Sequence, residues 1–277
     1  MSKNIILFIL ISVFMYGCFP KPTDYNGKYP PRVAAEKNLD LAQRAIDEDY
    51  YEEAFNILDF VKKHYPYELE AQEHVRVLYG DVLFKQGKYI DAISIYQTFI
   101  KIHPNSKYVP YAQFKIAKSY YNDMPSDFIL FPPPYERDKD SIIYAQKALI
   151  FYIGSYPKGK NIKEAKEMLQ KTMDYLANYQ FYVGNFYYKR EKYRGAVRRF
   201  KNVIFEHPKS SYVKESIYKS ALSYIRLKDG VNAKKYMELF AKKYPKSEEL
   251  NDIKEEFNDT KFPESKETEK TEKTAIK

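Results

Sequence analysis

The chain has 277 residues, of which 44% are hydrophobic and 30% are charged, so it can bury a core but cannot be a bundle of membrane-spanning helices. The chain contains only 9 glycines but 29 tyrosines and 18 phenylalanines. This composition disfavours glycine-rich phosphate loops and favours helices. The single cysteine excludes an intramolecular disulfide and a thiolate zinc site.

The formal net charge of +9 raises nucleic acid as a partner. The basic residues are scattered, however, and the sequence contains no arginine-rich block, zinc finger or basic motif interleaved with aromatic residues. We therefore predict a lysine-rich surface and no nucleic-acid ligand. Acidic lipids or proteins stay open as partners.

Residues 1–17 are predicted to be a signal peptide. Lys3 supplies a positive start, and residues 5–15 form an apolar run interrupted by one serine. A spanning helix needs about 20 apolar residues, so this run is too short to cross a bilayer. Export from the cytoplasm follows.

The apolar run ends at Cys18, within a segment that resembles a bacterial lipobox. The resemblance implies that Cys18 is acylated and holds the protein on a membrane; the alternative is an incidental cysteine in an ordinary signal peptide. Phe19 occupies the position at which an aspartate would favour retention in the inner membrane. We therefore expect the protein to be anchored in the inner leaflet of the outer membrane. Residues 18–31 are predicted to form a stiff tether with four prolines: Pro20, Pro22, Pro30 and Pro31.

A repeat is visible in the prolines and small residues. Five prolines follow a tyrosine or histidine: Pro66, Pro104, Pro157, Pro208 and Pro245. Twelve residues before each stands an alanine: Ala54, Ala92, Ala145, Ala196 and Ala233. Twenty-four residues before four of these prolines stands another small residue: Ala42, Gly80, Gly184 and Ala221. In the third repeat the equivalent Ala117 lies sixteen residues too early, which indicates an insertion.

Paired helices explain this spacing. Two antiparallel helices approach closely only where the side chains at their crossing are small, and proline ends the second helix. One turn after each alanine, a larger side chain would fill the groove between neighbours: Leu58, Tyr96, Leu149, Phe200 and Met237. The sequence therefore predicts an all-α fold, a right-handed superhelical array of five tetratricopeptide repeat (TPR) helix hairpins.

The repeats divide the chain after the tether. Residues 32–158 are expected to hold repeats 1–3, with an insertion at about 123–140. Residues 159–250 are expected to hold repeats 4 and 5, entered through a long bridging helix whose apolar residues recur at helical spacing from about 163 to 188. Residues 251–277, rich in lysine, glutamate and threonine, are predicted to be a charged, disordered tail.

No catalytic constellation is recognisable. His64, His103 and His207 fall at predicted helix C-termini, where a partly charged ring complements the helix dipole, and His74 is isolated. HExxH, GxSxG and Walker motifs are absent from the sequence. We predict no catalytic residue, no metal and no cofactor.

Binding is therefore the expected activity. The first helices of successive hairpins line a concave surface in such arrays. Aromatic side chains beside lysines on these helices suit an extended peptide that ends in an aromatic residue and a carboxylate; the alternative is ordinary packing and solvent exposure. The residues expected in this groove are Gln43, Asp81, Phe84, Lys85, Phe114, Lys118 and Tyr121.

From Arg32 to Pro245, together with the lipobox, the chain resembles the BamD family, TPR lipoproteins of the machinery that inserts β-barrels into the bacterial outer membrane. The resemblance rests on five repeats behind a lipobox cysteine and on three local segments. These are Tyr65-Pro66-Tyr67, Glu136-Arg137-Asp138 in the third-repeat insertion, and Leu176-Ala177-Asn178-Tyr179 in the fourth repeat.

The resemblance implies a non-enzymatic scaffold at the periplasmic face of the outer membrane. Its C-terminal repeats would dock on a BamA-type barrel subunit, and its N-terminal repeats would receive the C-terminal signals of unfolded barrel proteins. Arg198 and Arg199 fall where the family places an arginine near that subunit, and Glu136, Arg137 and Asp138 match a second partner segment. The proline-rich insertion and the charged tail depart from the family pattern.

Two alternatives stay open. One is another TPR scaffold of the envelope, a coordinator of cell-wall synthesis or of the Tol-Pal system. The other is an anchored wall hydrolase. The Tol-Pal coordinator usually has a coiled coil before its repeats, where only about fifteen residues are available after Cys18. The hydrolase needs a catalytic domain, for which the residues outside the repeats are too few.

Overall fold

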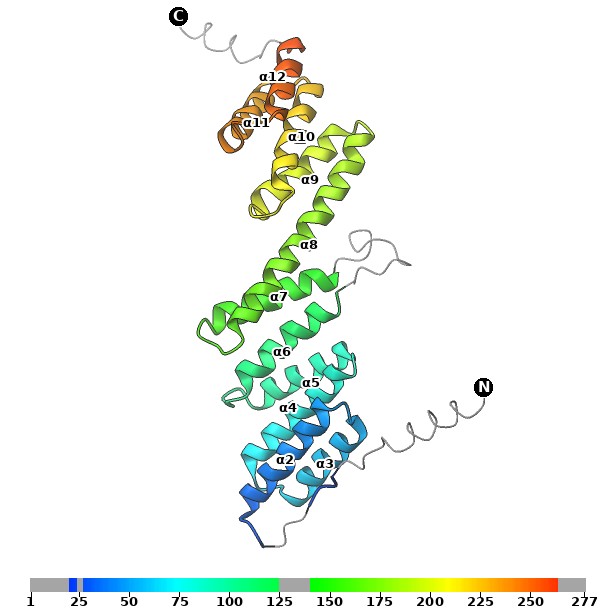
Figure 1. The fold of residues 1–277 in the computed structure, drawn as a ribbon, viewed down its shortest axis with the longest axis vertical. Coiled ribbons are helices and arrows are strands. Elements are labelled where there is room, and N and C mark those ends of the chain that lie inside the picture. Colours follow the sequence, from blue (N-terminus) through cyan, green and yellow to red (C-terminus); the bar gives the residue numbers. More distant parts are fainter. Residues whose placement is uncertain (1–19, 24–26, 125–139, 264–277) are drawn as a thin grey trace, which may run out of the picture. The chain divides into compact units, whose positions relative to one another are not determined.

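The computed structural model describes residues 20–23, 27–124 and 140–263. Over these residues the regular structure is entirely α-helical, and consecutive helices pair as hairpins (Figure 1). The prediction of an all-α array of TPR hairpins is confirmed. The helices are α2 (Pro31–Asp47), α3 (Tyr51–His64), α4 (Leu69–Lys85), α5 (Tyr89–Ile102), α6 (Val109–Asn122), α7 (Asp140–Ser155), α8 (Ile162–Lys189), α9 (Tyr193–Glu206), α10 (Val213–Arg226), α11 (Gly230–Lys243) and α12 (Glu249–Asp259).

The helices form two compact units. Of the described residues, unit 1 comprises 20–23, 27–124 and 143–168, and unit 2 comprises 140–142 and 169–263. The long helix α8 contributes residues to both units. Its bounds lie within one residue of those expected for the bridging helix.

The repeat residues have the predicted packing roles. All five repeat alanines are completely buried. Of the five larger side chains one turn later, Leu58, Tyr96, Leu149 and Phe200 are also completely buried, whereas Met237 is partly exposed. Each repeat proline lies two residues after the end of the second helix of its hairpin, in the turn that leads to the next repeat. The proline thus stops one helix without starting the next.

Two glycines mark the closest helix approaches. A Cβ atom on Gly80 of α4 would lie 2.5 Å from the ring of Tyr96 in α5. A Cβ atom on Gly184 of α8 would lie 2.6 Å from the ring of Phe200 in α9. In both hairpins the aromatic ring therefore occupies the space that the missing side chain leaves. A glycine at the crossing point therefore allows the partner helix to place an aromatic ring against its backbone.

This packing predicts opposite effects at two helical glycines. Gly80→Ala should lower the free energy of unfolding by about 1–3 kcal/mol, because the buried Tyr96 ring has no room to move aside. Gly154→Ala, in α7, meets no atom within 4 Å and should raise the free energy of unfolding by up to about 1 kcal/mol. Urea denaturation followed by circular dichroism measures both. Equal effects at the two positions would contradict the packing role of Gly80.

Four hairpin turns share one backbone conformation. After α2, α4, α8 and α10 the chain passes through a residue with positive φ: Asp49 (64°), Gly87 (74°), Glu191 (58°) and Lys228 (56°). The next N–H then donates a hydrogen bond of 2.8–3.0 Å to the carbonyl five residues earlier. This is the Schellman ending of a helix, which usually has glycine at the positive-φ position. Only Gly87 meets that preference, so packing of the hairpin imposes the turn elsewhere.

The C-terminal boundary differs from the sequence prediction. Residues 251–259 belong to α12, which packs on α10 and α11, so the expected start of a disordered tail at residue 251 is wrong. Ile253 is fully buried, and Lys214 and Arg226 of α10 pair with Glu249 at 2.7 Å and Glu256 at 2.9 Å. The high charge content of this segment suggested disorder, but the segment forms a short amphipathic helix. The carboxylates of α12 pair with cationic side chains of α10.

Other predicted segments lie outside the described residues. They are the signal peptide, Cys18, most of the third-repeat insertion and residues 264–277. The insertion is flanked by the end of α6 at Asn122 and the start of α7 at Asp140, close to its expected limits. Among the helices that the structure describes, none combines the length and the apolar character needed to cross a bilayer.

Candidate functional site

The predicted groove residues lie on the first helices of repeats 1–3. Gln43 is in α2; Asp81, Phe84 and Lys85 are in α4; Phe114, Lys118 and Tyr121 are in α6. They do not form one open surface, because Asp81 is only 3% exposed and Phe114 is also buried. Both were expected to face a ligand, and both instead pack inside unit 1.

Asp81 is the centre of a buried polar cluster that joins three helices. Its carboxylate accepts a hydrogen bond of 2.7 Å from the hydroxyl of Tyr96 in α5 and one of 3.0 Å from the hydroxyl of Tyr111 in α6. The ammonium group of Lys115 in α6 lies 2.9 Å from the same carboxylate. A buried charge is tolerated when it is paired and hydrogen-bonded in this way. We call these four residues the Asp81 cluster.

The environment of the Asp81 cluster shifts its proton affinities. Burial lowers the pKa of Lys115, and the nearby Asp81 carboxylate opposes that shift. Burial, reinforced by Asp81, raises the pKa of both Tyr96 and Tyr111. The Lys115 ammonium also lies 3.8 Å from the centre of the Phe84 ring, a cation-π contact. The cluster is saturated with internal partners, which makes it a structural element of the repeats.

Two further groove residues are engaged within unit 1. The ring of Phe114 packs against that of Tyr152 in α7, with 5.4 Å between ring centres. Lys118 forms an ion pair of 2.7 Å with Glu164 in α8. Gln43, Phe84 and Tyr121 are partly exposed, and Lys85 is exposed. The accessible part of the predicted groove is therefore smaller than the sequence suggested.

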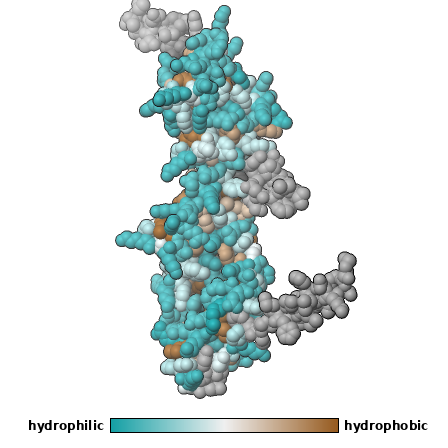
Figure 2. Space-filling model, viewed as in Figure 1, coloured by the Kyte–Doolittle hydropathy of each residue, from teal (hydrophilic) through white to brown (hydrophobic). Residues whose placement is uncertain are grey.

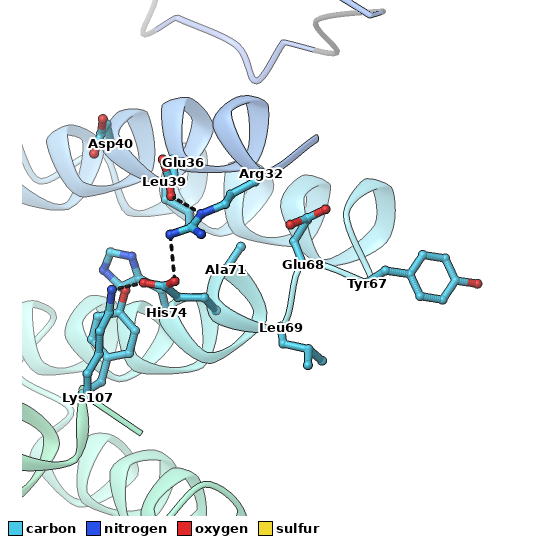
Figure 3. A pocket seen from close by; sticks show the side chains of 12 residues that line it. Arg32, Glu36, Leu39, Asp40, Tyr67, Glu68, Leu69, Ala71, His74 and Lys107 are labelled. Atoms are coloured by element: carbon cyan, nitrogen blue, oxygen red, sulfur yellow. Dashed lines mark hydrogen bonds and ion pairs between the residues drawn. The ribbon is translucent and has the colours of Figure 1, made fainter. Parts of the chain in front are cut away.

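A hollow of about 500 Å³ that contains none of the predicted groove residues opens at the N-terminal ends of α2 and α4 and the turn before α6 (Figure 3). We call it the α2/α4 hollow. Tyr67 and Leu69 line it, and they are 91% and 76% exposed. In Figure 3 the Tyr67 ring points away from the ion pairs of the hollow. The full lining is Arg32, Glu36, Leu39, Asp40, Tyr67, Glu68, Leu69, Glu70, Ala71, His74, Lys107 and Tyr108.

Ion pairs cross the α2/α4 hollow. Arg32 contacts Glu36 and Glu70 at 3.1 Å each, and Lys107 also pairs with Glu70 (Figure 3). These exposed pairs contribute little to stability, but they order the charged side chains around the opening. The lining has four carboxylates, from Glu36, Asp40, Glu68 and Glu70, against two permanent cations. The hollow therefore has a negative balance, which disfavours a free carboxylate as its occupant.

His74 forms part of the floor of the hollow. Its ring stacks on Tyr108, with 4.7 Å between ring centres. Burial lowers the pKa of His74, against the opposing charges of Asp81 and Asp40. His74 is thus neutral near pH 7 and presents an aromatic surface. His74 is isolated in the sequence because its stacking partner, Tyr108, is far from it in the chain.

The other histidines stand at helix ends, as predicted. His64 Nδ1 lies 2.9 Å from the Phe60 carbonyl oxygen, and His103 Nδ1 lies 3.4 Å from a Glu73 carboxylate oxygen. His207 is buried, and burial lowers the pKa of its ring. For His207, burial thus opposes the charged form of the ring that a helix C-terminus favours, while Glu206 and Asp174 act against this shift.

The two predicted interface arginines differ in their surroundings. Arg198 is exposed on α9, whereas Arg199 donates a hydrogen bond of 3.1 Å to the side-chain oxygen of Gln180 in α8. Glu136, Arg137 and Asp138 lie outside the described residues. Three further exposed residues share the helical face of Arg198: Arg194, Lys201 and Phe205. Sequence reasoning did not single out this stripe, although its spacing of four, three and four residues is visible in the chain.

Over much of the view in Figure 2 the surface is hydrophilic, and its hydrophobic areas are small and separate. Among the residues that the structure describes, no group of three or more His, Cys, Asp or Glu side chains is arranged to hold a metal ion. Over the described residues the chain is thus a helical-repeat protein, with a small lined hollow in one unit and a basic stripe in the other.

Comparison with known proteins identifies the family. A model described as "Outer membrane lipoprotein" matches residues 34–217, and a tetratricopeptide repeat model matches residues 215–247. The chain belongs to this outer membrane lipoprotein family, the BamD family. Its curated relatives are outer membrane protein assembly factors, which are not a kind of enzyme.

The similarity to these relatives extends over most of the chain. BamD of Rickettsia prowazekii is 24% identical over 250 residues, which is 89% of this chain and 93% of the relative. BamD of Neisseria gonorrhoeae is 22% identical, over 88% of this chain and 92% of the relative. A solved structure, the apo form of the quorum sensor NprR from B. thuringiensis, aligns over 90% of this chain and 74% of its own at 15% identity. Its TM-score of 0.29 is too low to define a common fold.

Proposed function

We propose that this protein is a non-catalytic, lipid-anchored scaffold at the periplasmic face of the outer membrane, acting in the assembly of β-barrel proteins. Membership of the BamD family over residues 34–217 carries the proposal. The lipid would be attached to Cys18, the only cysteine of the chain. The polar side chains of the Asp81 cluster bond to one another and are buried, so they are not available as catalytic groups, which favours a binding function.

Unit 2 would dock on a BamA-type barrel subunit. Arg198 is the better candidate of the two arginines, because Arg199 is held by Gln180. Exposed arginines and aromatic residues contribute more than other types to binding energy at protein interfaces, so Arg194 and Phe205 would contribute beside Arg198. Glu136, Arg137 and Asp138 stay proposed as a second contact.

Unit 1 would receive segments of unfolded barrel proteins. The aromatic and aliphatic surfaces of Tyr67, Leu69 and Tyr108 suit apolar side chains of an extended peptide. The negative balance of the α2/α4 hollow makes the exposed Lys85 a better partner for a terminal carboxylate. Leu69 and Lys85 stand at opposite ends of α4, roughly 24 Å apart, a length that about seven extended residues span.

Co-purification tests the docking proposal. The protein should co-purify with the large barrel subunit, and its depletion should lower the amount of barrel proteins in the outer membrane. Arg198→Glu should weaken the association by about 1–2 kcal/mol, or roughly 5- to 30-fold, because the exposed cation is replaced by an anion. Lys234→Glu, at an exposed position of α11, makes the same charge change and serves as the control. Unchanged barrel levels on depletion would favour a scaffold of cell-wall synthesis.

Site-specific cross-linking tests the hollow. A photoreactive residue at Leu69 should cross-link to a peptide taken from the last strand of an outer-membrane barrel protein. The same residue at Ile90, also exposed but in the first turn of α5, should not. Equal cross-linking at the two positions would remove the α2/α4 hollow from the proposal.

A further inference from the structure

One buried side chain fastens the segment before α2 to the first repeat. Asn38 of α2 is 0% exposed. The Thr23 N–H donates a hydrogen bond of 2.9 Å to Asn38 Oδ1, and Asn38 Nδ2 donates one of 3.0 Å to the Thr23 carbonyl. The same Nδ2 donates a second bond of 3.0 Å to the Ala34 carbonyl. The carboxamide thus satisfies both backbone groups of Thr23, and its own donor and acceptor groups are used in return.

This pairing shortens the tether. With Thr23 held, five residues (19–23) follow Cys18 up to the attachment point, instead of the thirteen (19–31) of the full tether. Five residues span at most roughly 18 Å when fully extended. Pro20 and Pro22 restrict this stretch further. A lipid on Cys18 would therefore hold the first repeat close to the bilayer surface.

Lysines and a tyrosine surround the fastened segment. The ring of Tyr29 packs against the core of the first repeat, and it has Lys37 at 4.7 Å and Lys28 at 5.6 Å from its centre. Lys21 is exposed, two residues before Thr23. Tyrosine and lysine are the side chains that favour the interface of a membrane, and lysines near an anionic surface add attraction.

The carboxylates of α2 lie on the other side of the helix. Glu36 and Asp40 line the α2/α4 hollow, and they are four residues apart on one face. Asn38 is two residues from each, which places it about 200° around the helix. In the sequence from Pro20 to Pro31 a single acidic residue, Asp24, accompanies two lysines. Residues 20–31 therefore carry a net positive charge, whereas the hollow has a negative balance; Lys37 lies between the two, three residues before Asp40 on α2.

We propose that Lys21, Lys28, Tyr29 and Lys37 form a membrane-contact face that binds anionic phospholipid headgroups, and that Asn38 holds the tether so that this face meets the bilayer. The inference rests on the proposed lipid attachment at Cys18. None of these four residues lines the α2/α4 hollow, which stays open to proteins.

Vesicle binding tests the face without its lipid anchor. The mature chain with Cys18→Ser should sediment with phosphatidylcholine vesicles that contain phosphatidylglycerol, and less with phosphatidylcholine alone. The triple variant K21E/K28E/K37E should lower partitioning by roughly 100-fold, the loss expected of three lysines at an anionic surface. The control K62E/K63E/K101E changes three exposed lysines of α3 and α5 and has the same net charge. Equal losses in both triple variants, or no preference for anionic vesicles, would overturn the proposal.

Failure of this test is separable from failure of the proposed anchor. None of these proteins carries an acyl group, so they report on the lysine face alone. Acylation is measured independently by fractionation of cells: Cys18→Ala should move the protein from the membrane to the soluble fraction. Retention of Cys18→Ala in membranes would contradict the lipid anchor and leave the vesicle result intact.

Two measurements test the arrangement itself. The chain contains no tryptophan, so Tyr29→Trp introduces a single fluorophore. On vesicles with brominated lipids, the acylated Tyr29→Trp protein should be quenched more than the acylated Ile90→Trp protein; equal quenching would overturn the membrane orientation. The Thr23 amide should be protected from hydrogen exchange, and Asn38→Ala should abolish that protection while the amides of α4 stay protected. An unprotected Thr23 amide in the unaltered chain would contradict the pairing.

Discussion

Asp81→Ala is expected to lower the free energy of unfolding of unit 1 by about 3–5 kcal/mol. The substitution removes the acceptor for Tyr96 and Tyr111 and leaves Lys115 buried without its counter-ion. An unpaired buried charge costs far more than the pair contributed. Urea denaturation followed by circular dichroism measures the loss.

Two controls separate this mechanism from general damage. Glu164→Ala breaks a more exposed lysine pair in the same unit and should cost no more than about 1 kcal/mol. Adding Lys115→Met to Asp81→Ala should recover part of the stability, because no charge is then left unpaired. A cost below 1 kcal/mol for Asp81→Ala would contradict the description of the cluster.

The pH dependence of the Asp81→Ala variant follows from Lys115. Burial lowers the pKa of this lysine, and Asp81 raises it, so removal of Asp81 should lower the pKa further. A lysine whose pKa is lower in the folded state than in the unfolded state destabilises the fold where it must carry its proton, and this penalty fades as pH rises toward the unfolded value. The loss in the variant should therefore be smaller at pH 10 than at pH 7.

Ile253→Ala is expected to lower the free energy of unfolding of unit 2 by about 2–5 kcal/mol. Ile253 is fully buried in the core that α12 shares with α10 and α11, so its truncation leaves a cavity. Lys254→Ala changes the next residue, which is exposed, and should alter stability by less than about 0.5 kcal/mol. Thermal and urea unfolding of the two variants measure the difference.

The outcome at Ile253 also decides the C-terminal boundary. A disordered segment from residue 251 would make both variants indistinguishable from the unaltered chain. A terminal helix that closes the array should instead make Ile253 as important as a residue of any inner repeat, because α12 covers the apolar face of the last hairpin with a polar outer surface.

The part of the fold that follows from local pattern was predictable. The spacing of alanines, glycines and prolines predicted the hairpins, because the crossing of two helices constrains residue size at fixed positions. Gly80 and Gly184 illustrate the limit of this reasoning. Their small size is visible in the sequence, but the pairing of Gly80 with the buried Tyr96 ring and of Gly184 with the buried Phe200 ring depends on the tertiary structure.

The candidate site was less predictable. Periodicity placed Asp81 and Phe114 correctly on first helices but could not determine their burial. The exposure of an inward-facing position depends on side chains from neighbouring helices, here Tyr96, Tyr111 and Tyr152. Because a carboxylate on a helix is solvated by default, the residue type of Asp81 gives no signal of its burial.

By itself, the sequence determined the repeat register, the helical class and the family resemblance, since these depend on residue size and type at fixed spacing. The tertiary structure decided which polar groups form hydrogen bonds or ion pairs with one another inside the fold. Asn38 pairs with Thr23 across fifteen residues, and Lys214 pairs with Glu249 across thirty-five. Such partners are set by the packing of helices that are distant in the chain, so no local pattern encodes them.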